Sequence, residues 1–159
     1  MTRTAIILSK LFIFLLVLSG LLVQAVLLPI QAGQSAQQFP EVAFLQAPIL
    51  ALGILFVACG QVVLGCVWVL LSLVRRDAIF SGRAFTYVDI MIGALVVAGA
   101  AIVVALLTIG LTANAGPPGI VFPAVGVALG CAALALVLVV MRGLLVRASE
   151  QEHYLAEVV

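Results

Sequence analysis

The sequence predicts an all-α fold: one integral membrane domain, residues 1–159, whose four helices form an up-down bundle with both termini in the cytoplasm. Three observations predict it. First, 66% of the 159 residues are hydrophobic and only 8% are charged, whereas soluble domains carry about 25% charged residues. Second, the ionisable residues leave three charge-free stretches, 11–40, 42–74 and 90–141. Third, all seven Lys and Arg residues fall on one side of a four-span arrangement, and that side is cytoplasmic because cationic loops resist translocation.

The predicted helices follow from the thickness of the hydrocarbon that each must cross. A helix needs about 20 apolar residues to span a bilayer, so the first two stretches hold one helix each, at 8–29 and 48–74. The third holds two, at 88–112 and 121–143, because Asn114-Ala115-Gly116-Pro117-Pro118-Gly119 interrupts it and consecutive Pro and Gly residues end helices. These stretches are apolar on every side and lack the alternation of membrane strands, which favours helices.

The first predicted helix has an alternative interpretation as a cleaved signal peptide. It has a basic start, and the small residues Ala32-Gly33 and Ser35-Ala36 follow it. Its apolar core from Leu11 to Leu28 is longer than the 7–15 residues of a signal peptide core. That length favours a retained helix.

The segment from Arg75 to Asp89, between the second and third helices, is the most specific loop. Its basic residues alternate with aromatic and aliphatic ones, a pattern that suits the headgroup layer. Asp89 is expected near the positive end of the third helix. The alternative is an anchored turn without another role, since aromatic and basic residues gather at membrane surfaces in any case. The candidates for contact with lipid or a cytoplasmic partner are Arg75, Arg76, Ile79, Phe80, Arg83 and Phe85.

The cytoplasmic tail, 144–159, is predicted to continue the fourth helix. Met141, Leu145, Ala148, Leu155 and Val159 fall at spacings that place them on one helical face. Such a segment can lie on the membrane surface or bind a partner. A frayed end is the alternative, because short isolated helices are marginal in water.

Residues that could support catalysis or metal binding are few. The predicted bundle holds no His, Asp, Glu or Lys that could activate a nucleophile, so we expect no enzyme and assign no catalytic, cofactor or metal residues. His153 and the glutamates of the tail are a weak ligand set. Cys59, Cys66 and Cys131 form no Cys-x-x-Cys motif and are interpreted as small buried residues, although Cys59 and Cys131 lie at similar depths. Direct nucleic-acid binding is not expected, because topology and anionic lipid explain the basic residues.

Two features inside the membrane bear on function. Gln24 and Gln61 are polar groups within apolar helices, and they either hydrogen-bond between helices or line a path for a transported species. Gly126 and Gly130 form a small-xxx-small motif in the fourth helix. Such a motif packs helices within one molecule or, alternatively, in a homodimer.

The stretch from Phe39 to Gly93 carries a resemblance to a known family. It contains Phe39-Pro40-Glu41-Val42-Ala43-Phe44-Leu45, then Cys59-Gly60-Gln61-Val62-Val63-Leu64, Leu73-Val74-Arg75-Arg76-Asp77-Ala78-Ile79-Phe80-Ser81 and Ala84-Phe85-Thr86-Tyr87-Val88-Asp89. It resembles the bacterial membrane protein family labelled domain of unknown function 2975, and the resemblance covers almost the whole chain. It implies a small four-helix membrane protein without assigned catalytic residues. Family members often lie beside genes for small helix-turn-helix regulators, although the acidic-Leu-Thr ending of many family tails is absent here.

Taken together, these patterns predict a small, non-catalytic, multi-pass protein of the bacterial inner membrane. It is expected to act through membrane lipids or through a partner, such as a cytoplasmic regulatory protein or a second copy of itself. The alternative is a small transporter or channel with Gln24 and Gln61 in its path.

Overall fold

The computed structural model describes residues 3–38, 44–74, 82–112 and 118–157, and its regular structure over these residues is helical, with no strand. In chain order the elements are α1 (Arg3–Leu22), the π-helical turn η1 (Val23–Leu27), α2 (Leu28–Gln38), α3 (Gln46–Val74), α4 (Gly82–Thr112) and α5 (Pro118–Glu157). Four stretches are long and apolar enough to cross a membrane: Ile6–Gln34, Gln46–Val74, Ala84–Leu111 and Val121–Arg147. The predicted all-α class and four spans are therefore confirmed.

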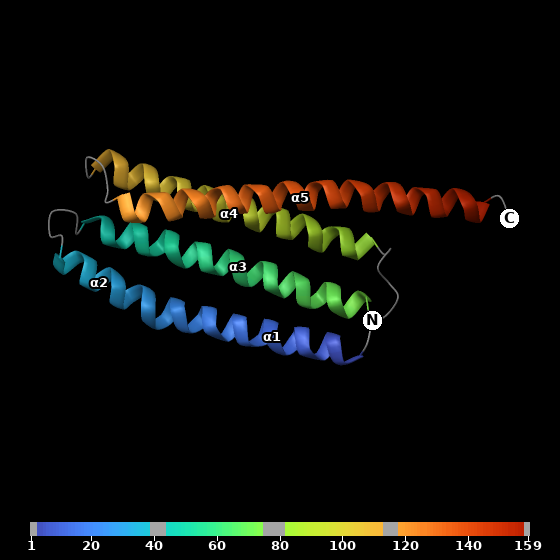
Figure 1. Ribbon diagram of the computed structural model, residues 1–159, viewed down its shortest axis with the longest axis horizontal. Coiled ribbons are helices and arrows are strands. Elements are labelled where there is room, and N and C mark those ends of the chain that lie inside the picture. The colour runs from blue at the N-terminus through green and yellow to red at the C-terminus, as the bar shows by residue number, and fades with distance from the viewer. Residues whose placement is uncertain (1–2, 39–43, 75–81, 113–117, 158–159) are drawn as a thin grey trace.

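The helices pack mainly on their neighbours in sequence (Figure 1). The first rod, made of α1, η1 and α2, packs on α3, α3 packs on α4, and α4 packs on α5. The contact of α1 with α3 is sparser than the two contacts that follow it. The described Lys10, Arg142 and Arg147 lie at the end where α1 and α4 begin and α3 ends, and we call this the basic end.

Three helix ends differ from the predicted ones. The first rod begins at Arg3 rather than residue 8 and continues to Gln38 rather than residue 29, and α4 begins at Gly82 rather than residue 88. The predicted continuation of the fourth helix into the tail is confirmed, because α5 continues past its span to Glu157. The end of an apolar run marks the edge of the hydrocarbon layer. The helix itself continues into water where no residue breaks it. Because α4 begins at Gly82, Asp89 lies about two turns into the helix rather than near its positive end, where it was expected.

The π-helical turn in the first rod has a local cause. Pro29 has no backbone N–H, and its ring would clash with the carbonyl of Ala25 in regular α-helical register. The chain responds with a wider turn, in which the N–H of Leu28 donates to the carbonyl of Val23. The rod thereby continues past Pro29, and Gln24 lies within the altered turn.

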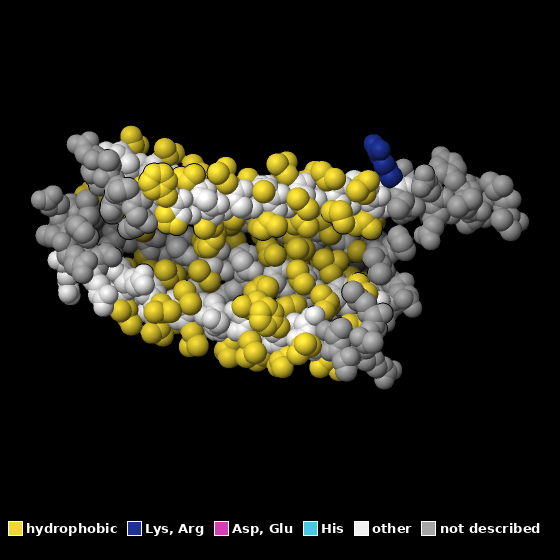
Figure 2. Space-filling model, in the orientation of Figure 1, with side chains coloured by type: hydrophobic (Ala, Val, Ile, Leu, Met, Phe, Trp, Pro, Cys, Tyr) yellow, Lys and Arg dark blue, Asp and Glu magenta, His cyan; other side chains and the backbone are white. Residues whose placement is uncertain are grey.

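Small residues form the interior of the molecule. Cys59 of α3, Ala98 of α4 and Cys131 of α5 make one buried cluster, against which Phe56 and Ala94 pack. Small side chains let helices approach closely, and this packing drives association where lipid removes the hydrophobic effect between helices. Most of the large apolar side chains on α1 and α5 are instead exposed, and they cover the face seen in Figure 2. That exposure suits a protein whose solvent is hydrocarbon.

Candidate functional site

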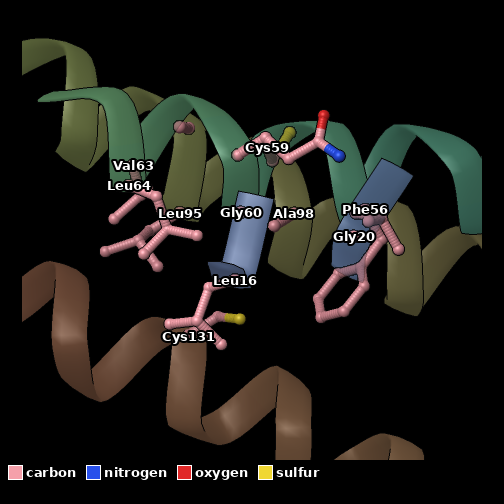
Figure 3. Close-up of a pocket in the computed structure, with 13 residues that line it drawn as sticks. Leu16, Gly20, Phe56, Cys59, Gly60, Val63, Leu64, Leu95, Ala98 and Cys131 are labelled. Atoms are coloured by element: carbon pink, nitrogen blue, oxygen red, sulfur yellow. The ribbon is translucent and has the colours of Figure 1, made fainter. Parts of the chain in front are cut away.

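A cavity of about 380 Å³ lies between the helices. Residues of all four spans line it (Figure 3): Leu16 and Gly20 from the first rod; Phe56, Val57, Cys59, Gly60, Gln61, Val63 and Leu64 from α3; Ala94, Leu95 and Ala98 from α4; and Cys131 from α5. Its wall is almost entirely apolar, and Gln61 is its amide-bearing residue. The cavity brings Cys59 and Cys131 to one site, as their similar depths suggested.

Gln24 and Gln61 are joined to each other by a hydrogen bond between the first rod and α3. Nε2 of Gln61 donates to Oε1 of Gln24 at 3.1 Å, and Nε2 of Gln24 donates to the carbonyl of Ile54 at 3.1 Å. A Cβ added at Gly20 would lie 3.0 Å from Nε2 of Gln61, so glycine permits this close approach. The arrangement agrees with the interhelical hydrogen-bonding interpretation. Gln61 lines the cavity, whereas Gln24 is not among the lining residues.

Replacing Gln61 with leucine is expected to lower the free energy of unfolding by about 0.6 kcal/mol, the average measured for interhelical hydrogen bonds in membranes, and by no more than about 1.7 kcal/mol. The loss arises because Oε1 of Gln24 is left without its donor. A second substitution, Gln24→Leu, removes that unpaired acceptor and should restore part of the stability. Unfolding by dodecyl sulfate in mixed micelles measures both effects, with the exposed Gln34→Leu as the matched control. A Gln61→Leu protein as stable as Gln34→Leu would show that the amide pair contributes nothing.

Two polar contacts tie the helices together at the basic end. Between α1 and α3, Nζ of Lys10 donates to Oγ of Ser72 at 2.9 Å and lies 5.2 Å from the ring centroid of Trp68. Between α4 and α5, Nη2 of Arg142 donates to Oδ2 of Asp89 at 2.9 Å. Nε of the same guanidinium lies 2.5 Å from Oδ1 of Asp89 as an ion-pair contact.

Sequence reasoning missed both contacts, because it used Lys10 and Arg142 only to orient the chain. One signal was present. Lys10, Ser72, Asp89 and Arg142 each lie within two residues of an end of their predicted spans, at a common depth. Polar groups at one depth in adjacent helices are expected to pair, since unpaired they are costly in the membrane.

The predicted interaction residues are only partly within the described structure. Arg75, Arg76, Ile79 and Phe80 lie outside the described residues. Arg83 belongs to the first turn of α4, and Phe85 follows there with a half-buried side chain. Of this set, the structure therefore describes the side-chain burial of Phe85 alone.

The small-xxx-small motif does not form the packing face of α5 in the described monomer. Gly126 and Gly130 are exposed, and a Cβ added at either would meet nothing within 4 Å. The face turned toward α4 carries Ala128 and Cys131 instead, and they pack against Gly99. The two glycines are offset around the helix from this face, which corrects the expectation that they join helices within one molecule.

Groups of at least three His, Cys, Asp or Glu side chains that could hold a metal ion do not occur among the described residues. The three cysteines are free thiols.

Comparison with known proteins gives one match. A family model described as "Protein of unknown function (DUF2975)" matches residues 30–159, from α2 to the end of the chain. No curated protein and no solved structure matches the chain. The match includes the segments between Phe39 and Gly93 on which the resemblance was based. The chain therefore belongs to the DUF2975 family of proteins of unknown function.

Proposed function

We propose that this member of the DUF2975 family is a non-catalytic protein of the bacterial cytoplasmic membrane that acts by binding. Its interaction surface is the basic end, facing the cytoplasm. The observation that carries the proposal is the length of α5, which continues from the end of its span at Arg147 to Glu157 (Figure 1). The extension is about 15 Å of helix at 1.5 Å per residue, which is more than a membrane anchor requires.

The polar contacts at the basic end support this proposal. Ser72 and Trp68, near the end of α3, hold Lys10, and Asp89, near the start of α4, holds Arg142. The two helices that border residues 75–81 are therefore each tied to another helix close to where that segment joins them. A rigid scaffold beneath a connecting segment is the usual arrangement for recognition, because it limits the entropy lost on binding.

The chemistry of the surrounding sequence indicates the kind of partner. Arg75, Arg76 and Arg83 supply positive charge, and Ile79 and Phe80 supply apolar contact. Aromatic and arginine residues dominate the binding energy of protein interfaces. We therefore propose a cytoplasmic protein with an acidic and apolar surface as the partner, and a helix-turn-helix regulator is the candidate that the family resemblance suggests.

The orientation is tested with reporters fused to the C-terminus of the full chain. A fluorescent protein that matures only in the cytoplasm should be bright, and alkaline phosphatase, active only outside, should be inactive. The reverse pattern would place the basic end outside and overturn the proposal.

Replacing both Phe80 and Phe85 with alanine is expected to weaken partner binding roughly tenfold or more, given that aromatic anchors each contribute about 1 kcal/mol or more. Crosslinking in cells, followed by quantitative mass spectrometry of the purified full chain, measures the loss for each captured protein. The matched control replaces Phe44 and Phe122, two exposed phenylalanines at the opposite end. If both double variants retain the same partners in the same amounts, the basic end is only an anchor.

A transporter or channel is the second candidate, and the position of Gln61 in the cavity wall favours it. Against it, the remainder of the wall is apolar, and the amide of Gln61 is engaged with Gln24. Flux measurements in proteoliposomes, with Gln61→Ala as control, distinguish the two functions. Flux that depends on Gln61 would replace the binding proposal with this one.

A further inference from the structure

The cluster of Lys10, Ser72 and Trp68 holds a cation that no described side chain neutralises. Nζ of Lys10 contacts a neutral hydroxyl and a neutral ring, and Oγ of Ser72 in turn donates to the carbonyl of Trp68 at 2.9 Å. The carboxylate described at the same depth, that of Asp89, is paired with Arg142. The part of the chain that the structure describes therefore leaves one uncompensated positive charge here.

This charge lies near the end of its span, where lysine side chains extend toward the headgroups of the lipids. Lys10 lies about one helical turn inside the span Ile6–Gln34, and Ser72 lies close to the end of α3. An ammonium group at this level is partly removed from water, which strengthens its attraction to an anion. The cytoplasmic leaflet, which the basic end is proposed to face, is the one that attracts basic residues through its anionic lipids.

Space for the remainder of a lipid lies beside the cluster. Trp68 is 37% exposed, and its ring can pack against a glycerol backbone, as tryptophan does at membrane surfaces. Gly65 lies one turn farther into the membrane on the same side of α3, and a Cβ added there would meet nothing within 4 Å. The contact between α1 and α3 is also the sparsest of the three contacts between spans. An acyl chain has room to lie along this open part of α3.

We propose that Lys10, Ser72 and Trp68 form a headgroup site for an anionic phospholipid of the leaflet at the basic end. Ammonium carries three N–H donors, of which Ser72 accepts one, so the others can bind a phosphate oxygen. The lipid phosphate supplies the negative charge that the described residues lack. The bound lipid also bridges α1 and α3, whose contact is the sparsest between neighbouring spans.

The test uses Trp68, the only tryptophan in the chain, as the reporter. The full-length protein is placed in vesicles of phosphatidylcholine with phosphatidylglycerol, and one of the two lipids carries brominated acyl chains that quench tryptophan emission. We expect phosphatidylglycerol to occupy the site beside Trp68 about fivefold more readily than phosphatidylcholine, which is the attraction expected of one lysine near the surface. High salt should reduce this preference.

Variants assign the preference to Lys10. Lys10→Gln should abolish it, and Lys10→Arg should keep it. The matched control, Arg147→Gln, removes an exposed cation of α5 at the same end. This variant should retain the preference for phosphatidylglycerol. Where Lys10→Gln fails to insert, equal quenching by the two brominated lipids in the wild-type protein still overturns the proposal.

Three results would overturn the proposal. Equal quenching by both lipids in the wild-type protein would mean that Lys10 only anchors α1. A preference that survives in Lys10→Gln would assign it to another cation. The same change in Trp68 emission on adding inorganic phosphate to vesicles of phosphatidylcholine alone would show a site for a small anion rather than for a lipid.

Discussion

Replacing Asp89 with arginine is expected to separate α4 from α5 at the basic end and to lower the free energy of unfolding by about 2–4 kcal/mol. The side chains of Arg142 and Asp89 are 41% and 47% exposed, so loss of the attraction alone, as in Asp89→Asn, should cost only about 1 kcal/mol. Arginine adds repulsion between two guanidinium groups at a partly desolvated site, which accounts for the remainder. Unfolding by dodecyl sulfate, followed by helical circular dichroism, measures the change.

A double variant in which the charges at positions 89 and 142 are exchanged is the control for this prediction. Asp89→Arg combined with Arg142→Asp restores opposite charges across the same helices and should recover most of the lost stability. If the single substitutions act only by removing an acidic residue or by changing the net charge, their effects on the free energy of unfolding should instead add in the double variant. If the exchanged protein is less stable than either single variant, the Asp89–Arg142 contact does not hold α4 to α5.

The number of spans could be predicted because it depends on a local property. Each apolar run is long enough to cross hydrocarbon whatever its neighbours do, and the break at Asn114 to Gly119 is visible in the sequence. The helix ends could not be predicted in the same way. At Pro29 a π-helical turn carries the first rod onward, whereas the continuation of the fourth helix past its span was predicted from the apolar spacing of the tail and is found as far as Glu157. Hydropathy reports the boundary of the bilayer in both places, not the boundary of the helix.

The polar contacts depend on how the helices are rotated about their axes, which the sequence does not specify. Gln24 and Gln61 were each recognisable as costly groups in hydrocarbon, but their pairing requires the first rod and α3 to turn these residues toward each other. From the sequence, Lys10 and Arg142 indicated only the orientation of the chain in the membrane, through their positive charges. The chemistry of these residues was therefore readable from the sequence, while their partners required the packed structure.

The glycine motif of α5 illustrates the same limit. A small-xxx-small pattern shows that a close helix contact is permitted on one face, yet many faces of these helices carry small residues. In the described monomer the contact with α4 uses Ala128 and Cys131, where Gly99 offers the complementary gap. Gly126 and Gly130 remain exposed on α5, and nothing in their spacing could have distinguished the two faces.

Replacing Gly99 with leucine is the second substitution expected to have a large effect. A Cβ at this position would lie 3.6 Å from Cβ of Cys131 and 3.9 Å from the carbonyl oxygen of Ala128, so alanine fits at ordinary contact distances. The additional carbons of leucine must displace the backbone of α5. Overpacking of this kind costs about 1–3 kcal/mol, whereas Gly99→Ala should be neutral or slightly stabilising because alanine favours helix.

Gly93 provides the matched control for Gly99 on the same helix. A Cβ added at Gly93 would meet nothing within 4 Å, so Gly93→Leu should change the free energy of unfolding by no more than about 0.5 kcal/mol. Because both substitutions add leucine to the membrane part of α4, a difference between them isolates the contact with α5. Equal losses would mean that α5 does not pack against α4 through Gly99, and the exposed face of Gly126 and Gly130 would then become the better candidate for that contact.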